Sequence, residues 1–405
     1  MSDAASAGRW RALFLIALAE LLIMSLWFSA TAAAPELATE WGLTPSESAW
    51  LTTSVQLGFV AGALLSAIFT LSDVIPPKYL IAGSALVGAG ATAAIATLVS
   101  SLLPAVALRF LTGMVLAGVY PPGMKLLAGW FRAGRGMAVG VLVGAITVGS
   151  ALPHLIRVIG GVGNPRAVLF GAAGVALVGA AMALFVTEGP YQSPAAPFDP
   201  RATVRILRDR PTLLANGGYF GHMWELYAVW TWIPVFLVAS LAAGTPGTAQ
   251  TAGLLAFATI AVGGFGALFA GLAADRLGRT TITSASMTVS GLSCLTAGFV
   301  FGAPLWILTP FVLLWGFAVI ADSAQFSVSI TELAEGSYVG TALTLQTAIG
   351  FLLTIVSIQL IPILVEFVGW QWAFAPLAIG PAIGTLSMLR LRMRPEAERL
   401  AGGRK

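Results

Sequence analysis

Apolar stretches of about 20 residues recur along the whole chain, separated by short charged or Pro/Gly-rich segments. A helix needs roughly 20 apolar residues to cross a hydrocarbon core of about 30 Å, so the pattern predicts an all-α membrane protein. We expect six spans in the first half, near 10–33, 47–71, 79–100, 102–127, 135–158 and 165–187, and six in the second, near 212–240, 249–273, 281–302, 304–328, 338–364 and 370–391.

The longest polar interruption lies at the middle of the chain and contains several prolines and arginines. Such a composition favours a solvated, semi-extended tether. We therefore predict an N-terminal six-helix bundle over 1–187, a cytoplasmic linker over 188–211, and a C-terminal six-helix bundle with a basic tail over 212–405.

Composition agrees with a membrane protein. Of the 405 residues, 58% are hydrophobic and 9% are charged, whereas an average soluble domain has roughly a quarter of its residues charged. The first apolar run, 12–34, is longer than the apolar core of a secretory signal peptide, so we expect it to be the first span. The single cysteine, Cys294, excludes an intrachain disulfide.

The basic residues predict the orientation of the chain. If the N-terminus is cytoplasmic, all of the 21 Lys and Arg except Arg109, Arg157 and Arg166 fall on the cytoplasmic side. We therefore expect both termini in the cytoplasm of a cell with a bacterial-type inner membrane. The net charge of +4 then reflects loops beside the lipid bilayer rather than nucleic-acid binding.

One segment of the second half carries a specific motif, Gly271-Leu-Ala-Ala-Asp275-Arg276-Leu-Gly278-Arg279. It resembles the signature loop of the major facilitator superfamily, G-x-x-x-D-R-x-G-R, which links paired helices on the cytoplasmic face. The resemblance implies two six-helix bundles related by a pseudo-two-fold axis and a latch that holds one side of the transporter shut.

The corresponding place in the first half keeps the acid, Asp73, but lacks the glycines and arginines of the motif. Asp73 and Asp275 are 202 residues apart, about half the chain, as two sequence-related halves require. We expect the first-half copy to contribute to the latch through Asp73 alone.

In the fourth span, Arg109-Phe-Leu-Thr-Gly113 resembles the R-x-x-x-G pattern of the same superfamily. The resemblance implies a role for Arg109 in proton coupling or in binding a substrate carboxylate. A hydrogen-bonding role toward nearby backbone carbonyls is the alternative, because a buried arginine needs partners.

Other polar side chains within spans are candidates for the solute or proton pathway, because burying a charge in lipid is costly unless it is paired or hydrated. They include three acids, two histidines and a glutamine: Glu20, Glu225, Asp322, His154, His222 and Gln346. Each acid could bind a proton, pair with a cation, neutralise Arg109 or stabilise its bundle.

The pattern as a whole predicts a secondary transporter that works by alternating access as a monomer. Arg109 and His154 favour uptake of a small organic anion by symport with a proton carried on Glu20, Glu225 or Asp322. Many aromatic residues favour the alternative, efflux of amphipathic or drug-like compounds by proton antiport. The sequence Gly144-Ala145 followed by Val148-Gly149 only half matches the G-P and G-G pairs of the superfamily's antiporters.

A non-transporting membrane sensor with the same fold is a third hypothesis. The sequence lacks a phosphate-binding glycine-rich loop, a His/Cys cluster with metal-ligand spacing and a nucleophile motif. We therefore expect no enzymatic activity, no cofactor and no metal.

Overall fold

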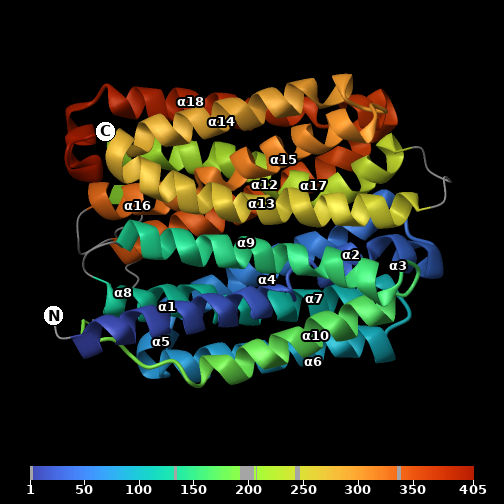
Figure 1. Ribbon diagram of the computed structural model, residues 1–405, viewed down its shortest axis with the longest axis horizontal. Helices are drawn as coiled ribbons and strands as arrows, with labels where there is room; N and C mark the ends of the chain where they lie inside the picture. The colour runs from blue at the N-terminus through green and yellow to red at the C-terminus, as the bar shows by residue number, and fades with distance from the viewer. Residues whose placement is uncertain (1–2, 132–134, 192–204, 207, 242–246, 335–338) are drawn as a thin grey trace.

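The computed structural model describes residues 3–131, 135–191, 205–206, 208–241, 247–334 and 339–405. Over these residues the protein is helical and contains no strand. Figure 1 shows two groups of helices side by side, one from each half of the chain, with both termini at the same end. We call that end the terminal face and the other end the opposite face.

The helices of the first half follow the predicted spans closely. They are α1 (Asp3–Met24), α2 (Ser29–Ala32), α3 (Ala34–Trp41), α4 (Pro45–Ile68), α5 (Leu71–Val74), α6 (Pro77–Leu98), α7 (Leu102–Leu116), α8 (Tyr120–Trp130), α9 (Arg135–Gly160) and α10 (Pro165–Ala183). Two of the six predicted spans are split, 10–33 into α1 and α2 and 102–127 into α7 and α8. Pro121 and Pro122 in the first turn of α8 explain the second break, because proline cannot donate the backbone hydrogen bond of a continuing helix.

The second half repeats this arrangement. Its elements are α12 (Arg210–Ser240), α13 (Thr248–Leu277), α14 (Arg279–Thr296), η1 (Ala297–Phe299), α15 (Leu305–Ala321), α16 (Ser323–Leu333), α17 (Val339–Trp372), η3 (Ala375–Ala378), α18 (Ile379–Arg392) and η4 (Pro395–Gly402). The break between α15 and α16 falls at Asp322 and divides the predicted span 304–328. In the first half, the break between α7 and α8 divides the corresponding span, 102–127.

Within the described ranges, nine helices are long and apolar enough to cross a membrane, with α7–α8 and α15–α16 each counted as one. Three further segments, α1, α14 with η1, and α18, pack in the two groups and complete six spans in each. For example, α1 packs against α9 and α10, and α14 packs against α18. The prediction of an all-helical membrane fold is confirmed.

Two local predictions are corrected by the structure. The signature segment does not form a loop, because it is helical up to Leu277, and α14 begins at Arg279. Gly278 alone makes the turn, with a φ of 94° that favours glycine. The eleventh span is longer than the predicted 338–364 and runs to Trp372 across a non-helical Gly369.

The two halves contact each other along glycine-lined helices. A Cβ added to Gly144 of α9 would lie 2.8 Å from the carbonyl oxygen of Gly264 in α13, and a Cβ added to Gly264 would lie 2.9 Å from the carbonyl oxygen of Gly144. Small residues at such positions let helix backbones approach closely. Of the glycines noted in the sequence, Gly144 therefore packs against the other half, whereas Gly149 packs against Leu21 of α1 in its own half.

We expect Gly264→Val to destabilise the protein by about 1–3 kcal/mol, because the side chain overpacks the contact with Gly144. The measurement is the midpoint of thermal unfolding in detergent. Gly174→Val in α10 is the matched control, since nothing lies within 4 Å of a Cβ at that position. Equal midpoints for the two variants would show that the α9–α13 contact is not tightly packed.

Candidate solute-binding cavity

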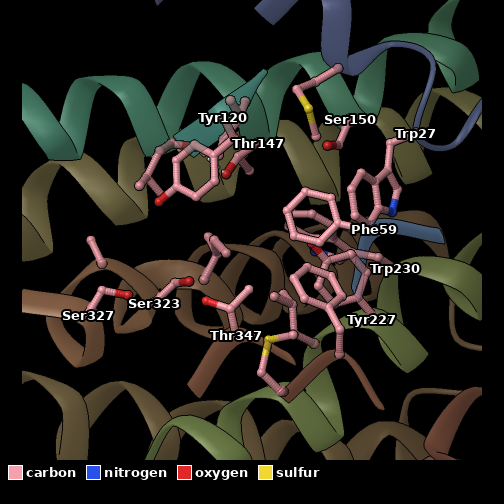
Figure 2. A pocket seen from close by; sticks show the side chains of 18 of the residues that line it. Trp27, Phe59, Tyr120, Thr147, Ser150, Tyr227, Trp230, Ser323, Ser327 and Thr347 are labelled. Atoms are coloured by element: carbon pink, nitrogen blue, oxygen red, sulfur yellow. Dashed lines mark hydrogen bonds between the residues drawn. The ribbon is translucent and has the colours of Figure 1, made fainter. Parts of the chain in front are cut away.

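A cavity of about 790 Å³ lies between the two halves near the middle of the molecule. Figure 2 shows side chains that reach it from both sides. Seven aromatic residues line it: Trp27, Phe59, Tyr120, Tyr219, Tyr227, Trp230 and Phe351. Five hydroxyl residues also line it: Thr147, Ser150, Ser323, Ser327 and Thr347.

One wall of the cavity is a cluster of six aromatic rings that joins the two halves; we call it the aromatic cluster. It consists of Trp27, Phe28 and Phe59 from the first half and Tyr227, Trp230 and Phe351 from the second. Ring centroids across the boundary are 4.8 Å apart for Phe59 and Phe351, 5.5 Å for Trp27 and Phe351, and 5.8 Å for Trp27 and Tyr227. These contacts hold the two halves together on one side of the cavity.

A second cavity, of about 1110 Å³, lies between the halves toward the opposite face. We call it the vestibule. Trp27 lines the central cavity, and Thr31, four residues later, lines the vestibule. Likewise, Trp230 lines the central cavity and the next residue, Thr231, lines the vestibule. The aromatic cluster therefore separates the two cavities.

Polar contacts between the halves reinforce this closure. The Thr354 hydroxyl of α17 donates to Oε1 of Gln56 in α4. Nε2 of Gln359 in α17 donates to the Thr53 hydroxyl of α4 at 3.5 Å. The contacts of α4 with α17 lie beside the aromatic cluster, where Phe59 and Phe351 meet.

Arg109 lies away from both cavities and is completely buried. Its guanidinium donates to the backbone carbonyl of Leu26 at 2.8 Å, to that of Leu51 at 3.1 Å, and to that of Trp27. It also donates to the Ser29 hydroxyl at 3.2 Å. These groups surround the break between α1 and α2, where carbonyls lack a regular helical partner.

Glu20 in α1 is also fully buried, on the same side of the break as the terminal face. Neither of its carboxylate oxygens has a hydrogen-bond partner among the described residues. The carboxylate packs directly against Gly123 of α8, at a position that a Cβ would occupy. Tyr120, one helical turn before Gly123, and Met24, one turn after Glu20, both line the central cavity.

Glu225 in α12 has a contrasting environment. It accepts hydrogen bonds from the Ser290 hydroxyl at 2.8 Å, the Trp315 indole at 3.0 Å and the Cys294 thiol at 3.1 Å. All four side chains are buried in the second half. Glu225 therefore joins α12, α14 and α15.

His222 and Asp322 form a buried pair between α12 and the junction of α15 and α16. The distance from Nδ1 of His222 to Oδ1 of Asp322 is 2.8 Å. The neighbouring residues Met223 and Ser323 line the central cavity, so the pair lies just behind its wall. Nε2 of His222 has no hydrogen-bond partner in the described part of the chain.

Gln346 in α17 lies behind the same wall. Its amide nitrogen donates to Oδ1 of Asn216 at 2.9 Å, and its oxygen accepts from the Ser327 hydroxyl at 3.4 Å. His154, in contrast, lines the vestibule, next to Arg157. Arg157 forms an ion pair with Glu36 of α3 at 2.6 Å.

The signature motif of the second half is held within that half. Arg279 is buried and pairs with both carboxylate oxygens of Glu332 at 2.7 Å, while Asp275 lies 3.5 Å from the same guanidinium. Glu332 also accepts from the backbone N–H of Ala401 in the tail. Arg276 is exposed. Gly271 is buried inside α13.

The Asp73 position lies in the short helix α5, and its side chain is outside the part of the structure that is described. Latch contacts at that copy therefore stay a prediction. Glu332, the main partner of Arg279, was not foreseen from the sequence, since no motif connects residues 53 positions apart.

Of the seven predicted pathway residues, none lines the central cavity, although Glu20, His222, Asp322 and Gln346 lie next to residues that do. The cavity residues that sequence reasoning did not single out include Phe59, Tyr219, Tyr227, Ser323 and Thr347. A helical-face comparison offers a partial signal for them, since Tyr219, Met223, Leu226 and Tyr227 recur three to four positions apart on α12.

The sequence matches the Major Facilitator Superfamily over residues 14–248 and 217–405. No curated protein sequence matches it at a significant level. Among solved structures it is similar to a D-xylose-proton symporter, with a TM-score of 0.75, 16% identity, and coverage of 96% of this chain and 99% of that one. It is also similar to the nucleoside transporter NupG, with a TM-score of 0.71, 13% identity, and coverage of 94% and 99%.

Two six-helix groups around a central cavity define a polytopic membrane transporter. The family match covers nearly the whole chain, and the chain belongs to the major facilitator superfamily. The resemblance seen in the signature motif is confirmed.

We expect Arg109→Lys to destabilise the protein, because an ammonium group cannot reach the three carbonyls and one hydroxyl that the guanidinium joins. Each buried acceptor left without a partner costs about 1–3 kcal/mol. The measurement is the thermal unfolding midpoint. Arg166→Lys is the control, since Arg166 makes one long bond of 3.3 Å to a backbone carbonyl. An unchanged midpoint together with weaker binding of anions would assign Arg109 to solute recognition instead.

Proposed function

We propose that this protein is a secondary active transporter that moves a small solute through the central cavity, driven by the proton gradient. It works in a bacterial-type inner membrane, as a monomer, with both termini in the cytoplasm. The terminal face is then the cytoplasmic face, and the vestibule opens to the outside. The positions of the basic residues support this orientation.

The observation that carries the proposal is the pair of cavities on one path, separated by the aromatic cluster. In alternating access, two halves rock about a fixed central site and expose it to one side at a time. Opening the contacts between α4 and α17 would join the central cavity to the vestibule. We propose that 1–187 and 212–405 move as units and that 188–211, mostly outside the described residues, joins them.

The partners of the buried charged groups support the proposal that each half moves as a rigid unit. Arg109, Glu225 and the His222–Asp322 pair each have their contacts within one half. The boundary between the halves instead carries glycines, aromatic rings and a few neutral polar contacts. Such a boundary can separate without leaving a buried charge unpaired.

We assign the proton to Glu20. A buried ionised carboxylate without a partner costs several kcal/mol or more, so this arrangement of α1 and α8 accommodates the neutral acid. Water that enters the central cavity as the halves separate at the terminal face would approach Glu20 past Met24 and Tyr120 and favour release of the proton. Glu20 lies one turn before Met24, which lines the cavity, and it contacts Gly123, which lies one turn after the cavity residue Tyr120. This proximity couples the protonation of Glu20 to the cavity.

The geometry gives less support to the solute hypothesis based on Arg109 and His154. Arg109 uses its donors on the backbone, and His154 lies in the vestibule. A small organic anion would therefore meet neither cation in the central cavity. The aromatic lining favours the second candidate among the hypotheses, export of an amphipathic compound, with the same proton site.

We expect Glu20→Gln to abolish proton-driven accumulation in proteoliposomes, by at least ten-fold, while exchange of solute at equal pH on both sides continues. Glutamine is nearly isosteric with glutamic acid but carries no exchangeable acid proton. Glu40→Gln is the control, since Glu40 is an exposed carboxylate on α3. Accumulation at the parent level in Glu20→Gln would exclude this residue as the proton carrier.

The direction of an imposed proton gradient separates the two candidates. Uptake that speeds up when protons flow inward indicates symport. Efflux driven by the same inward proton flow indicates antiport. A protein that binds solute but catalyses neither flux nor exchange would be the non-transporting sensor.

We expect a cross-link between α4 and α17 to stop transport. Cysteines at Gln56 and Thr354, whose side chains touch, are joined by a short bifunctional thiol reagent, and buried Cys294 does not compete. The rate should fall more than ten-fold and recover when a cleavable linker is cut. Cysteines at Thr31 and Thr52 are the control, because these hydroxyls are 2.6 Å apart within one half. Transport that survives the α4–α17 link would contradict opening at this contact.

A further inference from the structure

The lining of the central cavity limits the charge of its solute. Among the described residues that line it, none is an Asp, Glu, Lys, Arg or His. A charged solute would lose its hydration there without gaining a counter-ion, which is unfavourable in a buried site. Of the nearby acids, Glu225 and Asp322 already have partners, and Glu20 lies against Gly123 outside the cavity lining.

The aromatic cluster offers flat apolar surfaces from both halves. Trp27 and Phe59 of the first half and Tyr227, Trp230 and Phe351 of the second half line the cavity. Figure 2 shows Trp27, Phe59, Tyr227 and Trp230 close together. Their mutual ring contacts are tilted or edge-on rather than a closed stack. An aromatic ring of a solute gains favourable offset or edge-to-face contacts in such a group.

The polar groups of the cavity include hydroxyls on facing helices and the indole N–H groups of Trp27 and Trp230, which have no partner among the described residues. Thr147 and Ser150 come from α9 in the first half, and Ser323 and Ser327 come from α16 in the second. Ser150 and Ser323 face each other across the cavity from the two halves, whereas the Thr147 hydroxyl donates to the backbone carbonyl of Val143 and the Ser327 hydroxyl donates to Gln346. A hydroxyl both donates and accepts, so these groups suit neutral hydroxyl or carbonyl groups.

The amide side chains nearby are already engaged. Gln346 is bonded to Asn216 and Ser327, and Oε1 of Gln56 accepts from Thr354, while the Gln56 amide nitrogen has no partner among the described residues but does not line the cavity. A sugar carries many hydroxyls that each need a partner when buried. The cavity offers few polar groups beside its seven aromatic residues, which matches a solute with one or two polar groups better than a polyol.

We infer that the solute of the central cavity is an uncharged aromatic molecule carrying one or two hydroxyl or carbonyl groups. The ring lies against the aromatic cluster, and the polar groups lie between Ser150 of the first half and Ser323 of the second. Binding both serines at once would draw the halves together around the solute. This inference rests on the proposed function, because it assigns the solute of the same cavity.

Matched probes that differ only in charge test the inference. Benzyl alcohol and 2-naphthalenemethanol are neutral, benzoate and 2-naphthoate are anions, and benzylamine and 2-naphthylmethylamine are cations. D-xylose represents a polyol without an aromatic base, and uridine represents a polyol that carries one. Binding to the detergent-purified full chain is measured by thermal stabilisation, since a ligand that binds only the folded state raises the unfolding temperature.

We expect one of the two alcohols to bind at least ten-fold more tightly than the anion and the cation of the same ring, and more tightly than D-xylose. Ser150→Ala and Ser323→Ala should each weaken that binding by about three- to ten-fold. Tyr227→Leu should weaken it further. Ser387→Ala is the control, since its hydroxyl lies on an exposed face of α18 and donates to its own helix. Unfolding midpoints without probe confirm that each variant folds.

Tightest binding of an anion, a cation or D-xylose would overturn the inferred class, and so would failure of both alcohols to bind. Serine variants that bind the alcohol as the parent does would overturn the assigned position. These binding outcomes are independent of transport. If the alcohol binds but no proton-dependent flux follows in proteoliposomes, the proposed function fails while the solute class stands. If flux is found for a charged probe, the class fails while the transport function stands.

Discussion

The hydrogen bonds of Arg109 hold the structure of the first half around its cavity. The chain leaves the helical path between α1 and α2, and the carbonyls of Leu26 and Trp27 accept hydrogen bonds from the buried guanidinium. A third carbonyl, from Leu51, fixes α4 to the same point. Because Trp27 and Phe28 lie in this segment, the position of the first-half rings in the aromatic cluster depends on Arg109. Arg109 therefore affects the cavity indirectly, through the positions of these rings.

Other charged residues within the two halves are also held by partners. A charge in a low-dielectric interior requires a partner at every stage of a conformational cycle. Glu225, Asp322, Arg157 and Arg279 have partners in their own half, so relative motion of the halves leaves those pairs intact. Neutral groups are less costly to separate, and they form the boundary. The pairing of charges inside the halves, with aromatic and glycine contacts between them, supports the proposal that the halves move as rigid units.

Much of this fold could be predicted from the sequence, because hydropathy directly reports the length of membrane spans. The predicted spans agree with the helices apart from the breaks and the longer eleventh helix. The family was predicted correctly from the motif around Asp275 and Arg279, whose spacing is specific.

The candidate site was harder to predict, because residue type does not reveal which face of a helix meets the cavity. Trp306 and Phe367 are largely exposed toward the surroundings, whereas Trp27 is buried and lines the cavity, although all three lie in apolar spans. The partners of Glu225 lie 65 to 90 residues away in the sequence, so its role depends on packing that no local pattern encodes. For Arg109, the sequence left both a ligand and a carbonyl role open, and the carbonyls that it contacts beside the break after α1 could not be foreseen from a local pattern.

The contrast between Glu20 and Glu225 links packing to a possible energy source. Both are buried carboxylates in the first span of their half, yet Glu225 has three donors and Glu20 has none among the described residues. Three donors from α14 and α15 hold the Glu225 carboxyl group in one arrangement, so Glu225 suits a structural joint. The Glu20 carboxyl group lies against the bare backbone of Gly123, where an ionised carboxylate without a partner is costly. The two halves share a fold, but this asymmetry supports the proposal that the proton is carried in the first half, on Glu20.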